Sequence, residues 1–134
     1  MNIKNLIKSK FLRNKKDKVK PKNVGEEIAC RFLKKQKYKI KEKNFRSRFG
    51  EVDIIAEDSG TLCFVEVKSR SRSDYGLPEE FVDSRKQNKI VKTSLTYIND
   101  KKYESFNARF DVVSVNLKNS ECRLIRNAFE VGLF

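Results

Sequence analysis

The segment Gly50–Lys68, GEVDIIAEDSGTLCFVEVK, predicts two β-strands joined by a tight turn. Apolar residues dominate both halves of the segment, and turn-forming residues separate them. A two-residue loop at Ser59-Gly60 and a four-residue loop at Asp58–Thr61 give the same pairing of the strands. A three-residue loop would shift the pairing by one residue and turn every side chain of one strand to the other face. The face on which each polar residue lies therefore depends on this turn.

Four ionisable residues in these strands are expected to share one face of the sheet. With an even-numbered loop, Asp53 faces Glu66 and Glu51 faces Lys68, because alternate residues of a strand point to the same side. Two carboxylates about 4 Å apart repel by about 4 kcal/mol at an effective dielectric constant of about 20. A hard divalent cation such as Mg²⁺, bound through carboxylate oxygens, would offset this repulsion. With a lysine beside it, such a cation could hydrolyse a phosphodiester.

A simpler interpretation of the same pattern stays open. In a half-buried hairpin, Glu66 and Lys68 would form a solvated ion pair on the outer face. Asp53 argues against this interpretation, because it interrupts the apolar run Val52–Ala56, which is typical of a strand buried on both faces. An acid in such a strand needs a partner or a metal ion.

Charge is the most informative feature of the composition. The 134 residues include 31 Lys and Arg against 18 Asp and Glu, a formal net charge of +13. This excess predicts a polyanionic partner, nucleic acid ahead of an anionic membrane surface. The chain has no histidine, which excludes Ser-His-Asp triads, histidine-dependent metal nucleases and HEXXH hydrolases. Three widely spaced cysteines and the lack of a long apolar run predict a cytoplasmic protein with reduced thiols.

The chain divides into a basic amino-terminal arm, residues 1–22, and an α/β domain, residues 23–134. The arm has nine basic residues and one acidic residue, and we expect it to contact phosphates without reading base sequence. A solvated tail and a helix on a membrane surface are the alternatives. In the domain, hydrophobic periodicity predicts a helix, three strands, a helix and two strands, with a mixed central sheet packed between the helices.

These segments together resemble a known family. Asp53, followed thirteen residues later by Glu66-Val67-Lys68, is similar to the D…(D/E)xK signature of the restriction-endonuclease-like nucleases, which include archaeal Holliday-junction resolvases. More narrowly, the chain resembles the bacterial YraN-like family of predicted endonucleases from about Val24 to its end. The segments that carry this resemblance are GEEIACRFLKKQKYKI (25–40), NFRSRFGEVDIIAED (44–58), LCFVEVKSR (62–70), the helix around Arg85-Lys86-Gln87, RFDVVSV (109–115) and NAF (127–129). The resemblance implies a restriction-endonuclease-like mixed sheet flanked by helices, in the order α-β-β-β-α-β-β.

Residues outside the hairpin are further candidates for the site. Glu26 lies at the margin of the apolar face of the first helix and could add a carboxylate, the role of a helix-borne glutamate in the related resolvases. Alternatively, it complements the helix dipole. Lys86 and Gln87 are secondary candidates for substrate contact, because a polar side chain at the start of this helix often faces the active site in the superfamily; for Gln87 the alternative is a hydrogen-bonded helix-end amide. Asp111 is expected to be structural. Substrate phosphates would be held by Arg46, Arg48, Arg70 and Arg72.

We therefore expect a nucleic-acid-binding protein, with DNA favoured, that acts as a metal-dependent endonuclease using Mg²⁺ or Mn²⁺. A non-catalytic nucleic-acid-binding module on the same fold is the alternative. The expected catalytic residues are Asp53, Glu66, Lys68, Glu51 and Glu26. The expected ligands of the cation are Asp53, Glu66 and the carbonyl of Val67. No small-molecule cofactor is expected, because the chain has no glycine-rich phosphate loop. The oligomeric state stays open, with a dimer as one option.

Overall fold

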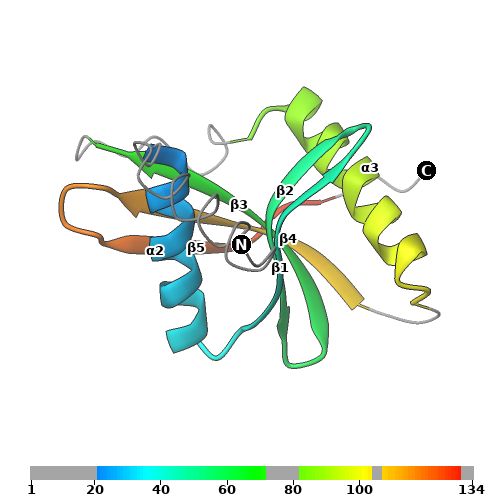
Figure 1. The fold of residues 1–134 in the computed structure, drawn as a ribbon, viewed down its shortest axis with the longest axis horizontal. Coiled ribbons are helices and arrows are strands. Elements are labelled where there is room, and N and C mark those ends of the chain that lie inside the picture. Colours follow the sequence, from blue (N-terminus) through cyan, green and yellow to red (C-terminus); the bar gives the residue numbers. More distant parts are fainter. Residues whose placement is uncertain (1–20, 72–81, 104–106, 131–134) are drawn as a thin grey trace, which may run out of the picture.

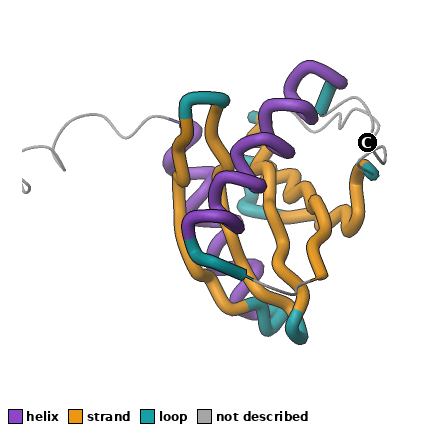
Figure 2. The backbone as a smooth tube through the Cα atoms, turned by 90° about the vertical axis from the view of Figure 1, so that its right-hand side faces the viewer, coloured by secondary structure: helices purple, strands orange, loops and turns teal. Residues whose placement is uncertain are grey.

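In the part of the chain that the structure describes, five strands form one mixed sheet, and one helix packs on each of its faces (Figure 1, Figure 2). The computed structural model describes residues 21–71, 82–103 and 107–130, so all but the last two residues of the basic arm lie outside the described residues. In chain order the elements are α2 (Pro21–Lys35), β1 (Lys39–Ser47), β2 (Gly50–Asp58), β3 (Thr61–Arg70), α3 (Ser84–Asp100), β4 (Asn107–Asn116) and β5 (Cys122–Phe129). This α-β-β-β-α-β-β order confirms the predicted restriction-endonuclease-like α/β fold.

The strands lie side by side in chain order, from β1 at one edge to β5 at the other. Every neighbouring pair is antiparallel except β3 with β4. A parallel pair cannot be joined by a hairpin, and α3 lies in the crossover that connects these two strands. In the described part of the chain, neither helix combines the length and the apolar character needed to cross a membrane.

Side-chain alternation in β3 divides the core into two layers. The side chains of Cys63, Val65 and Val67 are buried under α2, in a cluster that includes Ala29, Cys30 and Leu33 of that helix. The side chains of Leu62 and Phe64 are buried on the opposite face, in a cluster that includes Ile90 and Tyr97 of α3. Both faces of β3 are therefore covered by the helices.

The turn between β2 and β3 has the predicted two-residue loop. Asp58 pairs with Thr61, and the loop residues Ser59 and Gly60 have φ angles of 49° and 85°. Two successive positive φ angles are the mark of a type I′ turn, whose twist matches that of the flanking strands. The register continues regularly from this turn to the pair Ile54–Val65, which confirms the expected pairing over this part of the hairpin. The expected pairs Asp53–Glu66 and Glu51–Lys68 lie beyond it and are not part of the ladder.

Strand β2 changes direction close to Asp53. In a flat strand Val52 and Ile54 would share a face, but Val52 belongs to the α3-side cluster with Ile55, whereas Ile54 belongs to the α2-side cluster. The regular pairing with β3 also stops at Ile54. Beyond this point the hairpin of β1 and β2 turns toward α3, where the Ser47 and Thr93 hydroxyls are 3.0 Å apart. The predicted acids of β2 thus lie where it leaves β3.

Candidate active site

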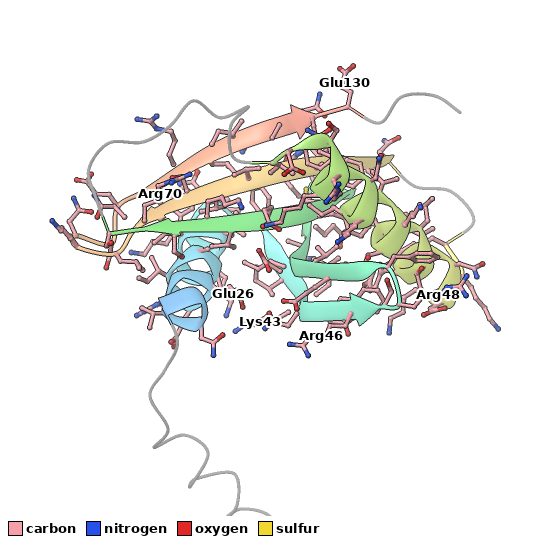
Figure 3. The ribbon with its side chains drawn as sticks, turned by 90° about the horizontal axis from the view of Figure 1, so that it is seen from above. Glu26, Lys43, Arg46, Arg48, Arg70 and Glu130 are labelled. Atoms are coloured by element: carbon pink, nitrogen blue, oxygen red, sulfur yellow. The ribbon has the colours of Figure 1, made fainter. Side chains whose placement is uncertain are left out.

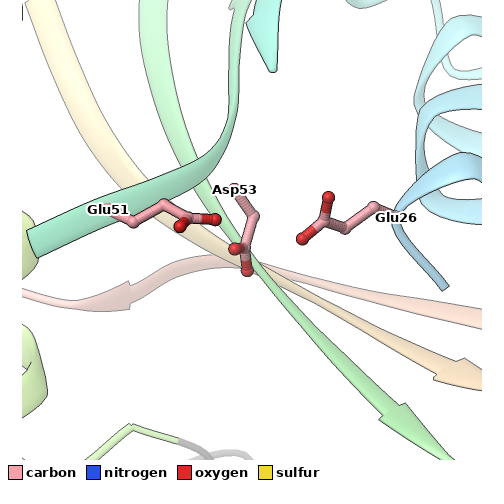
Figure 4. Close-up of side chains that lie close together, drawn as sticks. All are labelled: Glu26, Glu51 and Asp53. Atoms are coloured by element: carbon pink, nitrogen blue, oxygen red, sulfur yellow. The ribbon is translucent and has the colours of Figure 1, made fainter. Parts of the chain in front are cut away.

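Three carboxylates from two elements converge where β2 separates from β3. Glu51 and Asp53 extend from β2 and Glu26 extends from α2, and one carboxylate oxygen from each lies within 4.8 Å of the others (Figure 4). Glu26 is 5% exposed and Asp53 is 2% exposed, while Glu51 is half-buried. We call these three residues the acid cluster. Carboxylate oxygens gathered in this way are the donor set that Mg²⁺ and Mn²⁺ prefer.

Glu26 reaches the sheet because α2 approaches β3 very closely at the preceding residue. Gly25 is buried, and a Cβ atom at this position would overlap the Ser69 hydroxyl and lie 2.9 Å from the Ser69 Cβ. Only glycine fits a helix this close to a strand without displacing one of them. The sequence analysis did not identify Gly25 as important. A glycine within an amphipathic helix, next to a candidate acid, was the available signal.

Backbone and side-chain contacts orient the two acids of β2. The Val67 N–H donates a hydrogen bond of 2.8 Å to Asp53 Oδ2, so the buried carboxylate bridges the point where the strands part. Arg46 Nε donates to Glu51 Oε2 at 3.1 Å from the neighbouring strand β1. Arg46 is therefore one predicted substrate-binding arginine that lies against the acid cluster.

Glu66 lies next to Asp53 but is held by two lysines. Its side chain is 6% exposed, and its Oε1 atom forms an ion pair with the Lys86 ammonium of α3 and lies 3.8 Å from Lys68 Nζ. Burial raises the pKa of Glu66 to about 7, and the charge of Asp53 adds to this rise while the hydrogen bond from Lys86 opposes it. Glu66 thus joins the acid cluster on one side to a pair of ammonium groups on the other.

The two lysines have pKa values shifted in opposite directions. Burial lowers the pKa of Lys68, and the neighbouring Lys86 lowers it further. Burial also acts to lower the pKa of Lys86, but the hydrogen bond and charge of Glu66 outweigh it, so that the pKa of Lys86 is raised. Lys86 is therefore the more basic of the two amines, and Lys68 loses its proton more readily.

The structure brings together six of the predicted site residues. The six are Glu26, Glu51, Asp53, Glu66, Lys68 and Lys86. Asp53 groups with Glu26 and Glu51, and it also lies next to Glu66, whose pKa its charge raises. The expected sharing of a cation by Asp53 and Glu66 stays a prediction. Val67 contributes its N–H to Asp53, and its carbonyl stays a predicted ligand.

The remaining predicted substrate contacts are spread over the molecule. Arg48 lies in the turn after β1, with its guanidinium 4.8 Å from the centre of the Phe49 ring, and Arg70 lies at the far end of β3 (Figure 3). Figure 3 shows these two arginines at opposite ends of the fold, and their contact with a substrate stays a prediction. Gln87 donates its side-chain amide to the Val82 carbonyl at 2.9 Å, which matches the alternative of a hydrogen-bonded helix-end amide. Arg72 lies outside the described residues.

A second buried acid belongs to a separate, structural network. Asp111 is fully buried and accepts hydrogen bonds from Arg109 Nε at 3.0 Å, from the Tyr38 hydroxyl at 3.2 Å and from the Asn127 N–H at 2.9 Å. Arg109 also donates to Asp58 at 2.7 Å. This network joins β4, β5, β2 and the segment before β1, as expected for a structural Asp111.

Comparison with known proteins places the chain among relatives of similar size. Residues 25–115 match the uncharacterised protein family UPF0102. A UPF0102 protein of Syntrophus aciditrophicus is 52% identical over 111 residues, covering 81% of this chain and 87% of the relative. A UPF0102 protein of Clostridium botulinum is 46% identical over 112 residues, covering 80% and 91%. A UPF0102 protein of Persephonella marina is 46% identical over 87 residues, covering 65% and 73%. The match includes β2, β3 and the start of α3, from which most of the site is built.

Proposed function

This chain belongs to the UPF0102 family, also called YraN-like, and on that premise we propose that it is a divalent-metal-dependent nuclease, with DNA as the expected substrate. One observation supports this function above all. Three carboxylates from α2 and β2 converge within 4.8 Å beside a buried glutamate and two lysines. Charges of one sign are seldom gathered in a buried place unless a cation joins them.

Glu26, Glu51 and Asp53 would hold the cation, and their oxygen donors suit Mg²⁺ or Mn²⁺. A bound divalent cation polarises a phosphoryl oxygen and makes a neighbouring water a better nucleophile. Asp53 is fixed for this role by its hydrogen bond from the Val67 N–H and by its burial, so its carboxylate needs little reordering. Glu66 and the Val67 carbonyl would serve as further ligands.

Lys68 would act on the attacking water and on the transition state. It shares a face of β3 with Glu66, and its ammonium lies 3.8 Å from the carboxylate. Because its pKa is lowered, Lys68 can exchange a proton more readily than an exposed lysine. In its charged form it would stabilise negative charge that develops on the phosphoryl oxygens.

The charge of the whole chain supports a polyanionic substrate. A net charge of +13 raises the local concentration of nucleic acid and makes its binding depend on salt. Arg46, exposed beside Glu51, is placed to contact a phosphate near the acid cluster. The three free cysteines are consistent with a reducing cytoplasm as the site of action.

A non-catalytic nucleic-acid-binding protein is the second candidate, and one observation favours it. Glu66 already has Lys86 as a counter-ion, and Glu51 has Arg46, so part of the acid charge is neutralised within the protein. In that case the acids and their basic partners would stabilise the fold, and the positive charge of the chain would bind nucleic acid without a metal ion. The two candidates differ in whether nucleic acid is held equally well with and without a divalent cation.

Purified protein should be incubated with branched, single-stranded and duplex DNA in Mg²⁺, in Mn²⁺ and in chelator. The nuclease proposal requires cleavage of at least one substrate with metal, and loss of that cleavage in Asp53→Asn. Lys34→Met, which removes an exposed charge from the last turn of α2, about two turns beyond Glu26, is the matched control and should keep the activity. Undiminished DNA binding in chelator with no cleavage of any substrate would instead establish the binding module.

A further inference from the structure

Lys86 lies in the first turn of α3, and its side chain reaches the buried Glu66. Its backbone N–H donates to the N-cap residue Asp83 at 2.9 Å, and the neighbouring Gln87 side chain donates to the Val82 carbonyl at 2.9 Å. These two bonds anchor the first turn of the helix. The ammonium of Lys86 then forms an ion pair with Oε1 of Glu66. The pair thus joins an anchored helix end to the centre of the sheet.

The position of Glu66 makes this ion pair more than a surface contact. The Glu66 side chain is 6% exposed, whereas the Lys86 side chain is 41% exposed. Asp53 of the acid cluster lies within hydrogen-bonding distance of the same carboxyl group. A carboxylate oxygen that accepts a bond from an ammonium has fewer lone pairs to offer to a metal ion. Glu66 therefore already has a positive partner within the protein, beside the acid cluster.

We propose that Lys86 is the internal counter-cation of Glu66, and that a divalent cation which recruits Glu66 must first displace the Lys86 ammonium. This inference rests on the proposed function, because it requires a cation at the acid cluster. Lys86 keeps the buried Glu66 paired when no metal is bound, and it weakens metal binding by the same contact. Once displaced, its half-exposed ammonium is free to meet a phosphate of the substrate.

The test measures binding of Mn²⁺ alone, by titration calorimetry, to the full chain. The four proteins are wild type, Lys86→Met, Glu66→Gln and the double variant. Removal of Lys86 is expected to tighten Mn²⁺ binding about tenfold when Glu66 is present, because a competing charge a few ångströms away is lost. In the Glu66→Gln background the same change should have little effect. The difference between the two backgrounds isolates the contact from the general loss of a positive charge.

Each outcome decides one of the two proposals. An equal gain in both backgrounds, or no gain in either, overturns the role of Lys86. Loss of wild-type Mn²⁺ binding in Asp53→Asn supports the metal site by itself, whatever Lys86 does. If neither wild type nor Lys86→Met binds Mn²⁺, the proposed metal site and the inference both fail. Lys86→Gln, which keeps a polar side chain, replaces Lys86→Met if thermal unfolding shows that methionine disturbs the fold. Lys34→Met, in the last turn of α2, controls for the general loss of one positive charge.

Discussion

Replacement of Gly25 by alanine is expected to destabilise the protein, although alanine is the better helix former. Propensity alone predicts a gain of about 1 kcal/mol in the free energy of unfolding. The added methyl group, however, would overlap the Ser69 hydroxyl and lie 2.9 Å from the Ser69 Cβ. Overpacking of this kind costs about 1 to 3 kcal/mol and moves the backbone. The two terms together give a net loss of up to about 2 kcal/mol, measured by urea unfolding.

The same substitution should weaken metal binding, because Glu26 is the next residue along α2. A shift of α2 away from β3 would move the Glu26 carboxylate out of the acid cluster. Combining Gly25→Ala with Ser69→Gly removes the overlapping atoms and should recover stability and Mn²⁺ affinity together. Gly60→Ala is the control, because a Cβ there meets nothing within 4 Å and strains only the turn, at φ +85°. A more stable Gly25→Ala protein with unchanged Mn²⁺ affinity would refute the close approach of α2 to β3.

Three further results are expected. The pKa of Glu66 is raised from 4.5 to about 7, so between these pH values the folded state binds a proton that the unfolded state has lost. The contribution of Glu66 to the free energy of unfolding is therefore complete below pH 4.5 and is lost as pH rises through about 7. Urea unfolding in chelator should show this fall in wild type, and its persistence in Glu66→Gln would contradict the assignment. Lys68→Met should lower metal-dependent cleavage at least about hundredfold while leaving the melting temperature within a few degrees; retained cleavage would remove Lys68 from the mechanism. Asp111→Ala should destabilise by about 3 kcal/mol or more, because it leaves Arg109 partly unpaired in the interior, whereas Mn²⁺ affinity measured below the new melting point should not change.

The register of the central hairpin could be predicted because it depends on local chemistry. Ser59-Gly60 adopts the positive φ angles that a two-residue turn needs, and every pair up to Ile54–Val65 follows from that turn. The alternation rule then fails at Asp53, because it assumes a strand without a bend. Val52 packs on the α3 side and Ile54 on the α2 side, which reflects contacts with two helices that the hairpin sequence does not contain.

Contacts between distant segments were predicted less well. The sequence identified Glu66 and Lys86 as candidates but not as partners, since their meeting depends on how the crossover brings α3 back to β3. The role of the arginines stays a prediction. Arg70 is four residues beyond Glu66 on an extended strand, which separates their Cα atoms by about 13 Å, but its neighbour Ser69 lies against Gly25, the residue before Glu26. Arg48 lies in the turn between β1 and β2, three residues before Glu51.

The candidate site also connects the two helices of the fold. Its Glu26 carboxylate comes from α2 on one face of the sheet, and its Lys86 ammonium comes from α3 on the other face. The two core clusters share no residue, and at the parting of β2 and β3 Glu26 of α2 lies beside Asp53, while Lys86 of α3 pairs with Glu66. A cation held there at about a hundred times its dissociation constant would add about 2.7 kcal/mol to the free energy of unfolding. Binding of the cation should then slow amide hydrogen exchange in both α2 and α3. One small site would thus stabilise the layers on both faces of the sheet.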